Sequence, residues 1–468
     1  MLLERFEDSG LSQYSYVVGC PASGEAAIVD PRRDIGVYLD FAADRGLRIR
    51  YVIETHIHAD FASGARQLGE ESGAPVLVSG HDQGEAFEVA FAHHDLRHGD
   101  AIEVGAVRLE AVHTPGHTPE HMSYLVYDGA RSSTEPMALL SGDFLFVGSL
   151  GRPDLLGEEA KLGLANQLYE SVQGRLAGLP DWLEVLPAHG SGSMCGSNIG
   201  GRPASTLGYE RITNPYLDPR LGRDEFVELI LGSVPPFPDY YRRMKALNAL
   251  GAPSLALDQP VPELAVDDLA AGVRAGAVVV DVRDGLEFGA SHVPRAYNIG
   301  LGDDLSTWAA WYLPYETPLV LVAPDIDTAR EAVVGLARVG LDDVRGSLRG
   351  GMSAWIDAGK PTVTLPQLTL DELERGIEDE ALLVLDVRED NEWESGHLAT
   401  AVHVRGGDVP RHSRELAAIG RPVAVICQTG YRSSAAASVL QRDGVSGVAN
   451  VPGGVGAWQA GGRPLSAG

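Results

Sequence analysis

The second half of the chain contains two copies of one sequence pattern. The stretch 281–299, which begins with DVR, aligns without a gap on 386–404, at an offset of 105 residues (386 − 281). Later in each copy, GGMSAW at 350–355 matches GGVGAW at 453–458. Short β-branched runs alternate with helical patterns in both copies, as is typical of buried parallel strands covered by helices. The repeat therefore predicts two small α/β domains with parallel sheets.

Two breaks divide the 468 residues into three regions. The segment 251–262 is rich in proline and small residues, which suit neither a helix nor a strand, and a second break lies near Leu365-Pro-Gln. A chain of this length exceeds one ordinary core. We expect domains at 1–250, 262–364 and 366–468, and the first of them, which also mixes strands with helices, holds 10 of the 14 histidines.

Composition and charge exclude several classes of partner. The formal charge of −28 argues against nucleic acid or an anionic membrane surface. The N-terminus lacks an apolar signal core, and no apolar stretch of bilayer-spanning length occurs. Cys20, Cys195 and Cys427 form no CxxC pair, so neither a disulfide framework nor a zinc knuckle is expected. These features predict a cytoplasmic enzyme with reduced thiols.

In the first region, side chains suited to metals come directly after strand-like runs. THIHADF at 55–61 follows the apolar run 49–53, and His117, Asp143 and His189 each follow another such run. Loops at one edge of a sheet system lie close together. We therefore expect these side chains to converge on a single point.

The same stretches resemble the persulfide dioxygenase branch of the metallo-β-lactamase superfamily. The matching motifs are THIHADF at 55–61, TPGHT at 114–118, SGDFLFVGSLGRPD at 141–154, LPAH at 186–189 and ERITNP at 210–215. The resemblance implies an αββα sandwich and, at His56, His117 and Asp143, the ligands of one Fe(II) per chain. Phe61 departs from the superfamily's HxHxDH motif, whose last histidine helps to hold a second metal. Because phenylalanine cannot ligate a metal, the departure favours one metal and redox chemistry over two-zinc hydrolysis.

Coordination chemistry agrees with the implied ligand set. Two imidazoles and one carboxylate on one face of a metal suit Fe(II) oxygenases, and they leave positions open for a sulfur substrate and dioxygen. A hydrolytic zinc site needs only one open position for its water. His58 and Asp60 would then orient ligands or shuttle protons, and His189 would line the pocket. A ligand role for His58 or His189 stays an equal alternative.

Three other residues of this region have competing interpretations. Arg152, in the GRPD turn after Asp143, is expected either to meet an anionic substrate or to hold the loop. Cys195 lies in a glycine-rich loop six residues beyond His189. It either holds a persulfide near the metal, which is the favoured interpretation, or packs the loop. Cys20, on a turn after the run 14–18, is expected to be structural.

The last region contains DVR at 386–388, EWESGH at 392–397, CQTGYRS at 427–433 and GGVGAW at 453–458. With these motifs it resembles a rhodanese domain. Cys427 follows a buried strand and precedes an Ala/Ser-rich helix at 434–440. The helix N-terminus and the loop N–H groups would stabilise a thiolate there and cradle the outer sulfur of a persulfide. The expected loop residues are Gln428, Thr429, Gly430, Tyr431 and Ser433.

Arg432 closes this loop and is expected to supply a fixed cation for sulfite or thiosulfate oxygens. The alternative for Cys427 is a buried structural cysteine. In the middle copy, with Pro318 aligned on Pro422, Ala323 stands in the place of Cys427 and Thr328 in that of Arg432. Since alanine cannot carry sulfane sulfur, the middle copy is expected to be an inactive rhodanese that serves as a spacer or docking surface.

The whole chain resembles bacterial fusions of a persulfide dioxygenase with two rhodanese-like domains. The resemblance implies oxidation of a small-molecule persulfide by O2 to sulfite, and sulfur transfer that forms or uses thiosulfate, in sulfide detoxification. One alternative is a two-zinc hydrolase of a glutathione thioester fused to a sulfur-carrier domain. Another is a non-catalytic sulfur carrier or sensor that uses Cys427 alone. We expect a homo-oligomer, either a dimer or a tetramer.

Overall fold

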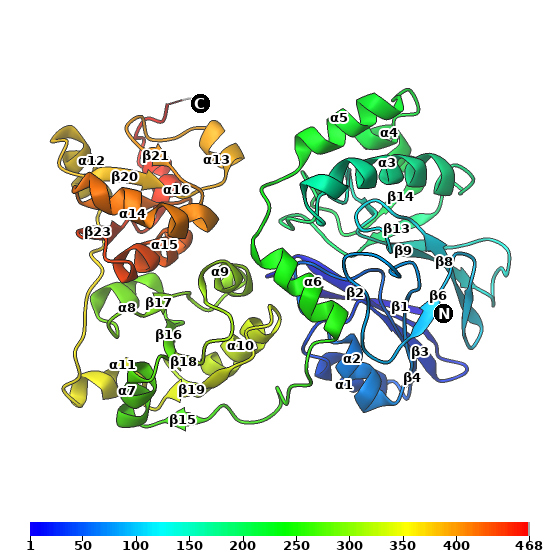
Figure 1. The fold of residues 1–468 in the computed structure, drawn as a ribbon, viewed down its shortest axis with the longest axis horizontal. Coiled ribbons are helices and arrows are strands. Elements are labelled where there is room, and N and C mark those ends of the chain that lie inside the picture. The colour runs from blue at the N-terminus through cyan, green and yellow to red at the C-terminus, as the bar shows by residue number, and fades with distance from the viewer. Residues whose placement is uncertain (467–468) are drawn as a thin grey trace. The chain divides into compact units, whose positions relative to one another are not determined.

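The computed structural model describes residues 1–466 (Figure 1). Two compact units make up the chain: residues 1–258 with 337–340, and residues 259–336 with those from 341 onward. Among the helices of the described residues, none combines the length and the apolarity that a bilayer crossing requires.

Two mixed sheets build the first unit. One runs in the order β1 (Leu2–Asp8), β2 (Gln13–Cys20), β3 (Glu25–Val29), β4 (Arg48–Ile53), β5 (Val76–Ser79) and β6 (His94–Leu96). The other runs in the order β14 (Ser205–Thr206), β13 (Glu184–Pro187), β10 (Ala138–Gly142), β9 (Met122–Asp128), β8 (Val107–His113) and β7 (Ala101–Val104). A small hairpin, β11 (Leu145–Phe146) and β12 (Ser149–Leu150), follows β10 along the chain.

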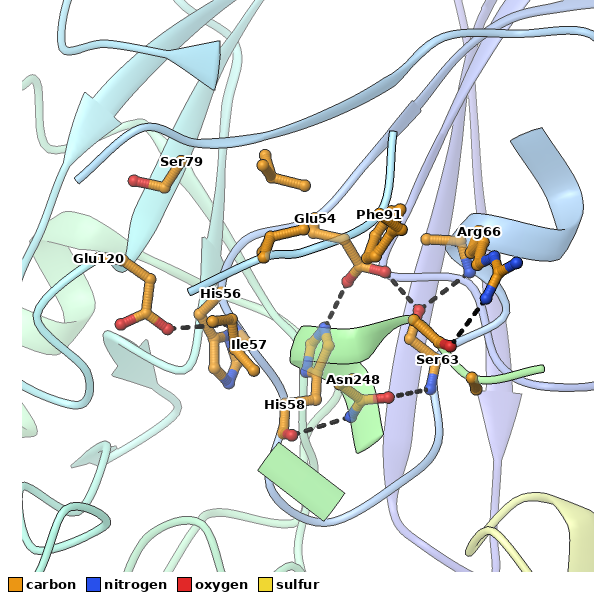
Figure 2. A pocket seen from close by; sticks show the side chains of 15 residues that line it. Glu54, His56, Ile57, His58, Ser63, Arg66, Ser79, Phe91, Glu120 and Asn248 are labelled. Atoms are coloured by element: carbon orange, nitrogen blue, oxygen red, sulfur yellow. Dashed lines mark hydrogen bonds and ion pairs between the residues drawn. The ribbon is translucent and has the colours of Figure 1, made fainter. Parts of the chain in front are cut away.

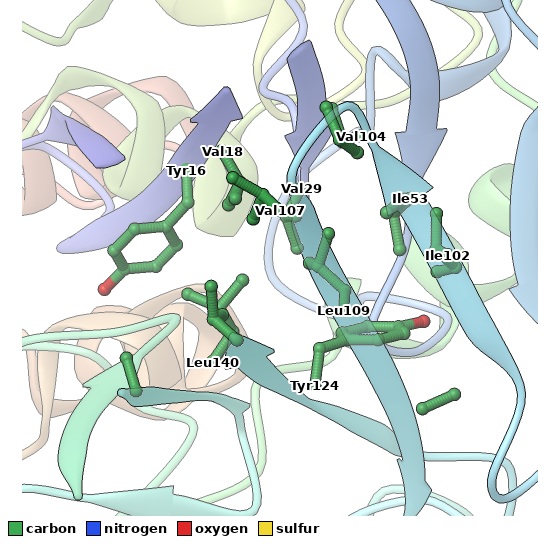
Figure 3. Close-up of a cluster of buried hydrophobic side chains, with 14 of the residues drawn as sticks. Tyr16, Val18, Val29, Ile53, Ile102, Val104, Val107, Leu109, Tyr124 and Leu140 are labelled. Carbon is green, nitrogen blue, oxygen red and sulfur yellow. The ribbon is translucent and has the colours of Figure 1, made fainter. Parts of the chain in front are cut away.

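The two sheets pack against each other through one apolar core (Figure 3). Successive side chains of a strand point to opposite faces, and on β8 the alternate residues Val107, Leu109 and Ala111 enter this core. The facing sheet contributes Val18 and Val29. The sheets therefore form the two inner layers of the unit.

Helices cover the outer faces of both sheets. The helices of the unit are α1 (Gly36–Asp44), α2 (Ala65–Ser72), α3 (Glu158–Arg175), α4 (Leu207–Thr213), η1 (Pro215–Leu217), α5 (Arg223–Ser233) and α6 (Tyr240–Leu250). Leu68 of α2 packs with Val52 of the first sheet, and Leu168 of α3 packs with Leu139 of the second. This arrangement confirms the predicted αββα sandwich.

The second unit holds both copies of the repeat, each with a parallel sheet. The middle copy has the strand order β15 (Glu263–Leu264), β19 (Val344–Leu348), β18 (Leu319–Val322), β16 (Val278–Asp281) and β17 (Tyr297–Asn298). The last copy has the order β21 (Val402–His403), β20 (Leu383–Asp386), β22 (Val423–Ile426) and β23 (Val448–Asn450). The predicted parallel strands are therefore confirmed in both copies.

Helices flank both of these sheets. The middle copy contains α7 (Val266–Arg274), α8 (Gly285–Ala290), α9 (Leu305–Tyr312), α10 (Ile326–Ala337) and α11 (Gly351–Asp357). The last copy contains α12 (Leu370–Glu378), α13 (Asp390–Glu394), η2 (Gly406–Asp408), α14 (Val409–Ile419), α15 (Tyr431–Arg442) and α16 (Gly454–Ala460).

Two sequence-based boundaries need correction. Cys20 does not lie on a turn but ends strand β2, because antiparallel pairing with Glu25 of β3 extends the strand to it. The helix expected at 434–440 begins earlier, at Tyr431, and ends later, at Arg442.

Candidate functional site

Four strand ends of the first unit bring the expected metal-type residues together. His56 follows β4, His117 follows β8, Asp143 follows β10 and His189 follows β13. All four side chains are buried. The prediction that these loops converge on one point is confirmed by the close approach of their polar atoms.

Three of these residues present polar atoms that have no hydrogen-bond partner among the described residues. They are Nε2 of His56, Nε2 of His117 and Oδ2 of Asp143. The carboxylate oxygen lies 3.8 Å from the first nitrogen and 3.4 Å from the second, and potential ligand atoms of the three residues lie within 4.8 Å of one another. Buried polar atoms without partners are rare, because each loses its hydration without compensation. A metal ion among these atoms would satisfy all three, so His56, His117 and Asp143 fit a metal-binding site.

Hydrogen bonds fix the tautomers of both imidazoles. Thr55 donates its hydroxyl proton to Asp30 at 2.9 Å, so the contact of 2.9 Å between Thr55 Oγ1 and His56 Nδ1 is donated by the imidazole. His117 Nδ1 donates to the backbone carbonyl of Arg152 at 2.9 Å. In each ring Nε2 is therefore left with a free lone pair. Burial also lowers the pKa of both histidines well below the ordinary value, which favours the neutral, metal-binding form.

Asp143 is held by two further histidines. Its backbone N–H donates to Nε2 of His121 at 2.9 Å, and its Oδ1 accepts from Nδ1 of His189 at 2.8 Å. His121 in turn contacts Thr114 Oγ1 through Nδ1 at 2.9 Å. His121 was not among the predicted site residues, although its place four residues after His117, in the same loop, was a usable signal.

His189 bridges two carboxylates rather than presenting a free nitrogen. Besides the bond to Asp143, its Nε2 lies 2.6 Å from Oδ2 of Asp60. Burial lowers the pKa of His189, but the carboxylates of Asp143 and Asp60 outweigh this and raise it to about 10. Both ring nitrogens therefore donate protons. This geometry agrees with the pocket-lining interpretation of His189 and with an orienting interpretation of Asp60.

His58 points into a different group of polar residues. Its Nε2 lies 2.8 Å from Glu54 Oε2 and 3.2 Å from Asp30 Oδ1. Burial opposes a charge there, yet Asp30 and Glu54 raise the pKa of His58 well above its ordinary value. Its Nδ1 has no hydrogen-bond partner among the described residues, and potential ligand atoms of Asp30, Glu54 and His58 lie within 4.8 Å of one another. This geometry agrees with an orienting role for His58 and equally with a ligand role.

A small cavity adjoins His56 and His58 (Figure 2). Its lining is mixed: Glu54 and Asn248 are polar, and Phe91 is apolar.

Helix α6 clamps this loop from a distant part of the sequence. Lys245 Nζ donates to the carbonyl of Ile57 at 2.8 Å, and Asn248 Nδ2 donates to the carbonyls of His58 and Phe61 at 2.9 and 2.7 Å. Both side chains are buried. Neither residue was among the predicted site residues, although polar residues three apart on one helix face were a weak signal.

Cys195 is buried beside the same helix. Its Sγ lies 3.7 Å from the hydroxyl of Tyr241, and its carbonyl accepts from the backbone N–H of Arg152 at 2.8 Å. Potential ligand atoms of Asp60, His189 and Cys195 lie within 4.8 Å of one another. Burial raises the pKa of Cys195 well above its ordinary value, so the thiol form is favoured. The side chain thus lies next to the metal-type residues, as the functional interpretation requires.

Arg152 uses all its donors inside the protein. Nε and Nη2 donate to the two carboxylate oxygens of Asp154 at 2.7 and 2.8 Å. The remaining N–H groups donate to the carbonyls of Met194 and Pro236 at 3.0 and 3.3 Å, and of Pro235 at 2.7 Å. Since a guanidinium has five N–H donors, none is left for an anionic substrate. Of the two interpretations, the geometry supports the one in which Arg152 holds the loops.

We expect Arg152→Leu to destabilise the protein strongly. The substitution leaves Asp154 and three carbonyls without their partner, and breaking a buried ion pair from one side costs about 3–5 kcal/mol. Chemical denaturation of the full chain measures this cost, with the exposed Arg202→Leu as control. Unchanged stability together with weaker persulfide binding would instead favour the substrate-binding interpretation.

The Cys427 loop joins β22 to α15 and is closed by the repeated glycine motif. Cys427 is buried, and its Sγ accepts from the N–H of Gly430 at 3.1 Å. Its carbonyl accepts from Val455 N–H at 2.8 Å. Gly454 has φ of +56°, and a Cβ there would collide with the Cys427 carbonyl oxygen. The glycine pair of the motif is thus required by the close approach of these two segments.

The other predicted loop residues surround the same turn. Gln428 and Thr429 accept from Gly456 and Gly453 N–H groups at 3.0 Å through their carbonyls. The Ser433 hydroxyl is buried and has no hydrogen-bond partner among the described residues. Arg432, however, is not a free cation: both of its terminal nitrogens bond Glu392, at 2.6 and 2.7 Å.

The middle copy lacks the cysteine but packs on the helix of the Cys427 loop. Ala323 is buried at the aligned position. Asn298 of β17 accepts from Ser434 at 2.6 Å and donates its N–H to Ser438 at 3.0 Å, while Tyr431 donates to the Gly300 carbonyl at 2.8 Å. Residues of the middle copy therefore hydrogen-bond three residues of α15.

Comparison with known proteins agrees with this architecture. The metallo-beta-lactamase superfamily matches residues 8–189, and the rhodanese-like domain matches residues 265–358 and 369–461. The chain is 30% identical over 232 residues to the mitochondrial persulfide dioxygenase ETHE1 of Homo sapiens, a match covering 49% of this chain and 80% of that protein. It is 35% identical over 191 residues to a hydroxyacylglutathione hydrolase of Polaromonas, covering 40% of this chain and 66% of that protein.

A solved structure covers more of the chain. The crystal structure of a metallo-beta-lactamase from Staphylococcus aureus has a TM-score of 0.66 and 34% sequence identity, and the match covers 74% of this chain and 98% of that one. The protein therefore belongs to the metallo-β-lactamase superfamily, with a domain homologous to persulfide dioxygenases fused to two rhodanese-like domains.

Proposed function

We propose that this protein oxidises the outer sulfur of a small-molecule persulfide with O2 and links this reaction to sulfur transfer at Cys427. In the first reaction one persulfide, one O2 and one water give one thiol, one sulfite and two protons. The observation that carries the proposal is the set of three unpartnered atoms on His56, His117 and Asp143. A ligand set of this kind leaves one side of a metal open for two reactants.

The protein's own residues would set the geometry of this site. A ferrous ion, when bound by the three side chains, supplies the one-electron chemistry that a reaction with O2 needs. Thr55 and the Arg152 carbonyl hold the two imidazoles in the ligand tautomer. His189 keeps one oxygen of Asp143 engaged, so that the other faces the metal position. Burial of all three ligands excludes bulk water from the reacting sulfur.

Sulfur transfer would take place at Cys427. A persulfide on this residue gives its outer sulfur to sulfite, the S–S bond breaks, and the electron pair returns to the Cys427 thiolate as thiosulfate forms. The reverse reaction loads Cys427 from thiosulfate. The Gly430 N–H that already bonds Sγ supports this assignment, since loop N–H groups stabilise a thiolate or a terminal sulfur anion.

A two-zinc thioester hydrolase is the second candidate. Two observations favour it: the clustering of Asp60, His189 and Cys195, and the similarity to a hydroxyacylglutathione hydrolase. Two others oppose it. Phe61 occupies the position of a ligating histidine and packs on the His58 ring, with centroids 4.4 Å apart, and both nitrogens of His189 already bond carboxylates.

Metal analysis separates the two candidates. We expect protein purified without oxygen to contain one iron per chain and to consume O2 when glutathione persulfide is added, because the unpartnered atoms of His56, His117 and Asp143 lie close enough together to hold one ion. Elemental analysis followed by an oxygen electrode measures both. Two zinc ions per chain, thioester hydrolysis and no O2 uptake would establish the hydrolase instead.

A further inference from the structure

Arg432, the cation of the Cys427 loop, already forms an ion pair with a carboxylate of the protein. Arg432 Nη1 and Nη2 bond the two carboxylate oxygens of Glu392, at 2.6 and 2.7 Å, in a two-pronged pair. The backbone N–H of Glu389 also donates to Glu392, at 3.0 Å, and fixes the carboxylate at the start of α13. Such bidentate pairs are geometrically specific. The guanidinium is thus held in place by a carboxylate anchored to the backbone.

Further carboxylates interact electrostatically with the same guanidinium. Glu389 of the last copy and Asp304 of the middle copy both lie within electrostatic range of Arg432. Both carboxyls have raised pKa values because of burial, with Arg432 acting in the opposite direction. The surroundings of Arg432 are therefore acidic, which disfavours a second anion beside it.

The pair is nevertheless open to exchange. Relative side-chain exposure is 18% for Arg432 and 28% for Glu392, so water and small solutes reach it. Partial exposure to water screens the attraction within the pair. A small anion that offers two oxygens to the guanidinium matches the geometry of the Glu392 carboxylate and would therefore compete with it for Arg432.

We propose that Glu392 is a specificity-determining residue of the sulfurtransferase site, at which sulfite or thiosulfate competes with its carboxylate for Arg432. The proposal rests on the sulfur transfer proposed above. In that reaction the Cys427 thiolate attacks the outer sulfur of thiosulfate, the S–S bond breaks, and its electron pair leaves with sulfite. No external oxidant or reductant takes part. Glu392 would weaken the binding of the inorganic anion without touching the sulfur that moves.

Substitution of Glu392 by glutamine tests the competition. Glu392→Gln in the full chain is expected to lower the KM for thiosulfate, with cyanide as acceptor, by about fivefold, the scale set by one partly exposed ion pair. Isothermal titration of thiosulfate into Cys427→Ser and into Cys427→Ser/Glu392→Gln measures the same change as binding, without turnover. An unchanged or raised KM would overturn the proposal, because Glu392 would then only hold Arg432 in position.

The repeat supplies a matched control. Glu287 of the middle copy aligns with Glu392, but Thr328 replaces the arginine there, so Glu287→Gln is expected to leave the KM unchanged. A double-mutant cycle adds a second check. In an Arg432→Gln background, Glu392→Gln is expected to have no effect on the KM, whereas an equal effect in both backgrounds would contradict competition for Arg432.

A separate measurement tests the proposed sulfur transfer itself, independently of the role of Glu392. Mass spectrometry of the wild-type chain after incubation with thiosulfate is expected to show one added sulfur on Cys427. Absence of this sulfur would overturn both the transfer reaction and the role of Glu392. Sulfur loading without a change of KM in Glu392→Gln would overturn the role of Glu392 alone.

Discussion

His117→Ala is expected to abolish O2 consumption with glutathione persulfide. The substitution removes one of three atoms that converge without hydrogen-bond partners. Loss of residues that merely orient a ligand typically costs about 10–100-fold in metal affinity or activity, so loss of a ligand is expected to cost at least about 100-fold. An oxygen electrode measures the rate, and elemental analysis of the same preparation measures the bound iron.

His113→Ala is the matched control for this experiment. His113 ends the same strand, β8, but its Nε2 contacts the carbonyl of Pro119 at 2.8 Å and its ring stacks on His81. We expect this variant to keep its iron and its O2 uptake. If His117→Ala also kept both, the assigned metal site would be wrong, whatever activity the protein has.

The positions of the metal-type residues could be predicted because strand ends are local features. His56, His117 and Asp143 each follow an apolar run, and runs of that kind mark buried strands whose ends share one edge. The αββα sandwich was expected only because these motifs resemble those of a known family. Convergence needs only that strands pair in the usual manner, so a sequence pattern is sufficient to indicate it.

The supports of the site could not be predicted, because they come from distant segments. Lys245 and Asn248 reach the 56–61 loop across more than 180 residues of sequence. The sequence of α6 itself does not indicate which loop its side chains contact. Arg152 shows the same limit: its turn indicated a charged residue near Asp143, but only the fold reveals that three distant carbonyls use its donors.

In the Cys427 loop, too, the local features could be predicted and the distant contacts could not. A cysteine between a buried strand and a helix N-terminus is a local pattern, and the structure has β22, the loop and α15 in that order. The pairing of Arg432 with Glu392 joins residues 40 apart. From the sequence, Arg432 was expected to bind substrate oxygens. The EWESGH motif did not indicate that its first residue, Glu392, already pairs with Arg432.

Cys427→Ser is expected to abolish sulfur transfer while O2 uptake stays unchanged. A serine cannot form a persulfide, and removal of a catalytic nucleophile costs on the order of 10³-fold to 10⁶-fold. The metal-type residues belong to the other unit of the chain and share no hydrogen bond with Cys427 among those of the described residues. Thiosulfate–cyanide sulfurtransfer and O2 uptake are measured on one preparation, with Cys20→Ser as control.

Product analysis of the same variant tests whether the two reactions are linked. With glutathione persulfide and O2 the wild type is expected to accumulate thiosulfate, because sulfite released by the first reaction meets a sulfur-loaded Cys427 on the same chain at raised effective concentration. Cys427→Ser is expected to accumulate sulfite in its place, at the same rate of O2 uptake. Thiosulfate formation that persists in the variant would mean that sulfite takes sulfur directly from the persulfide, and that the fused domains act independently even though each is active.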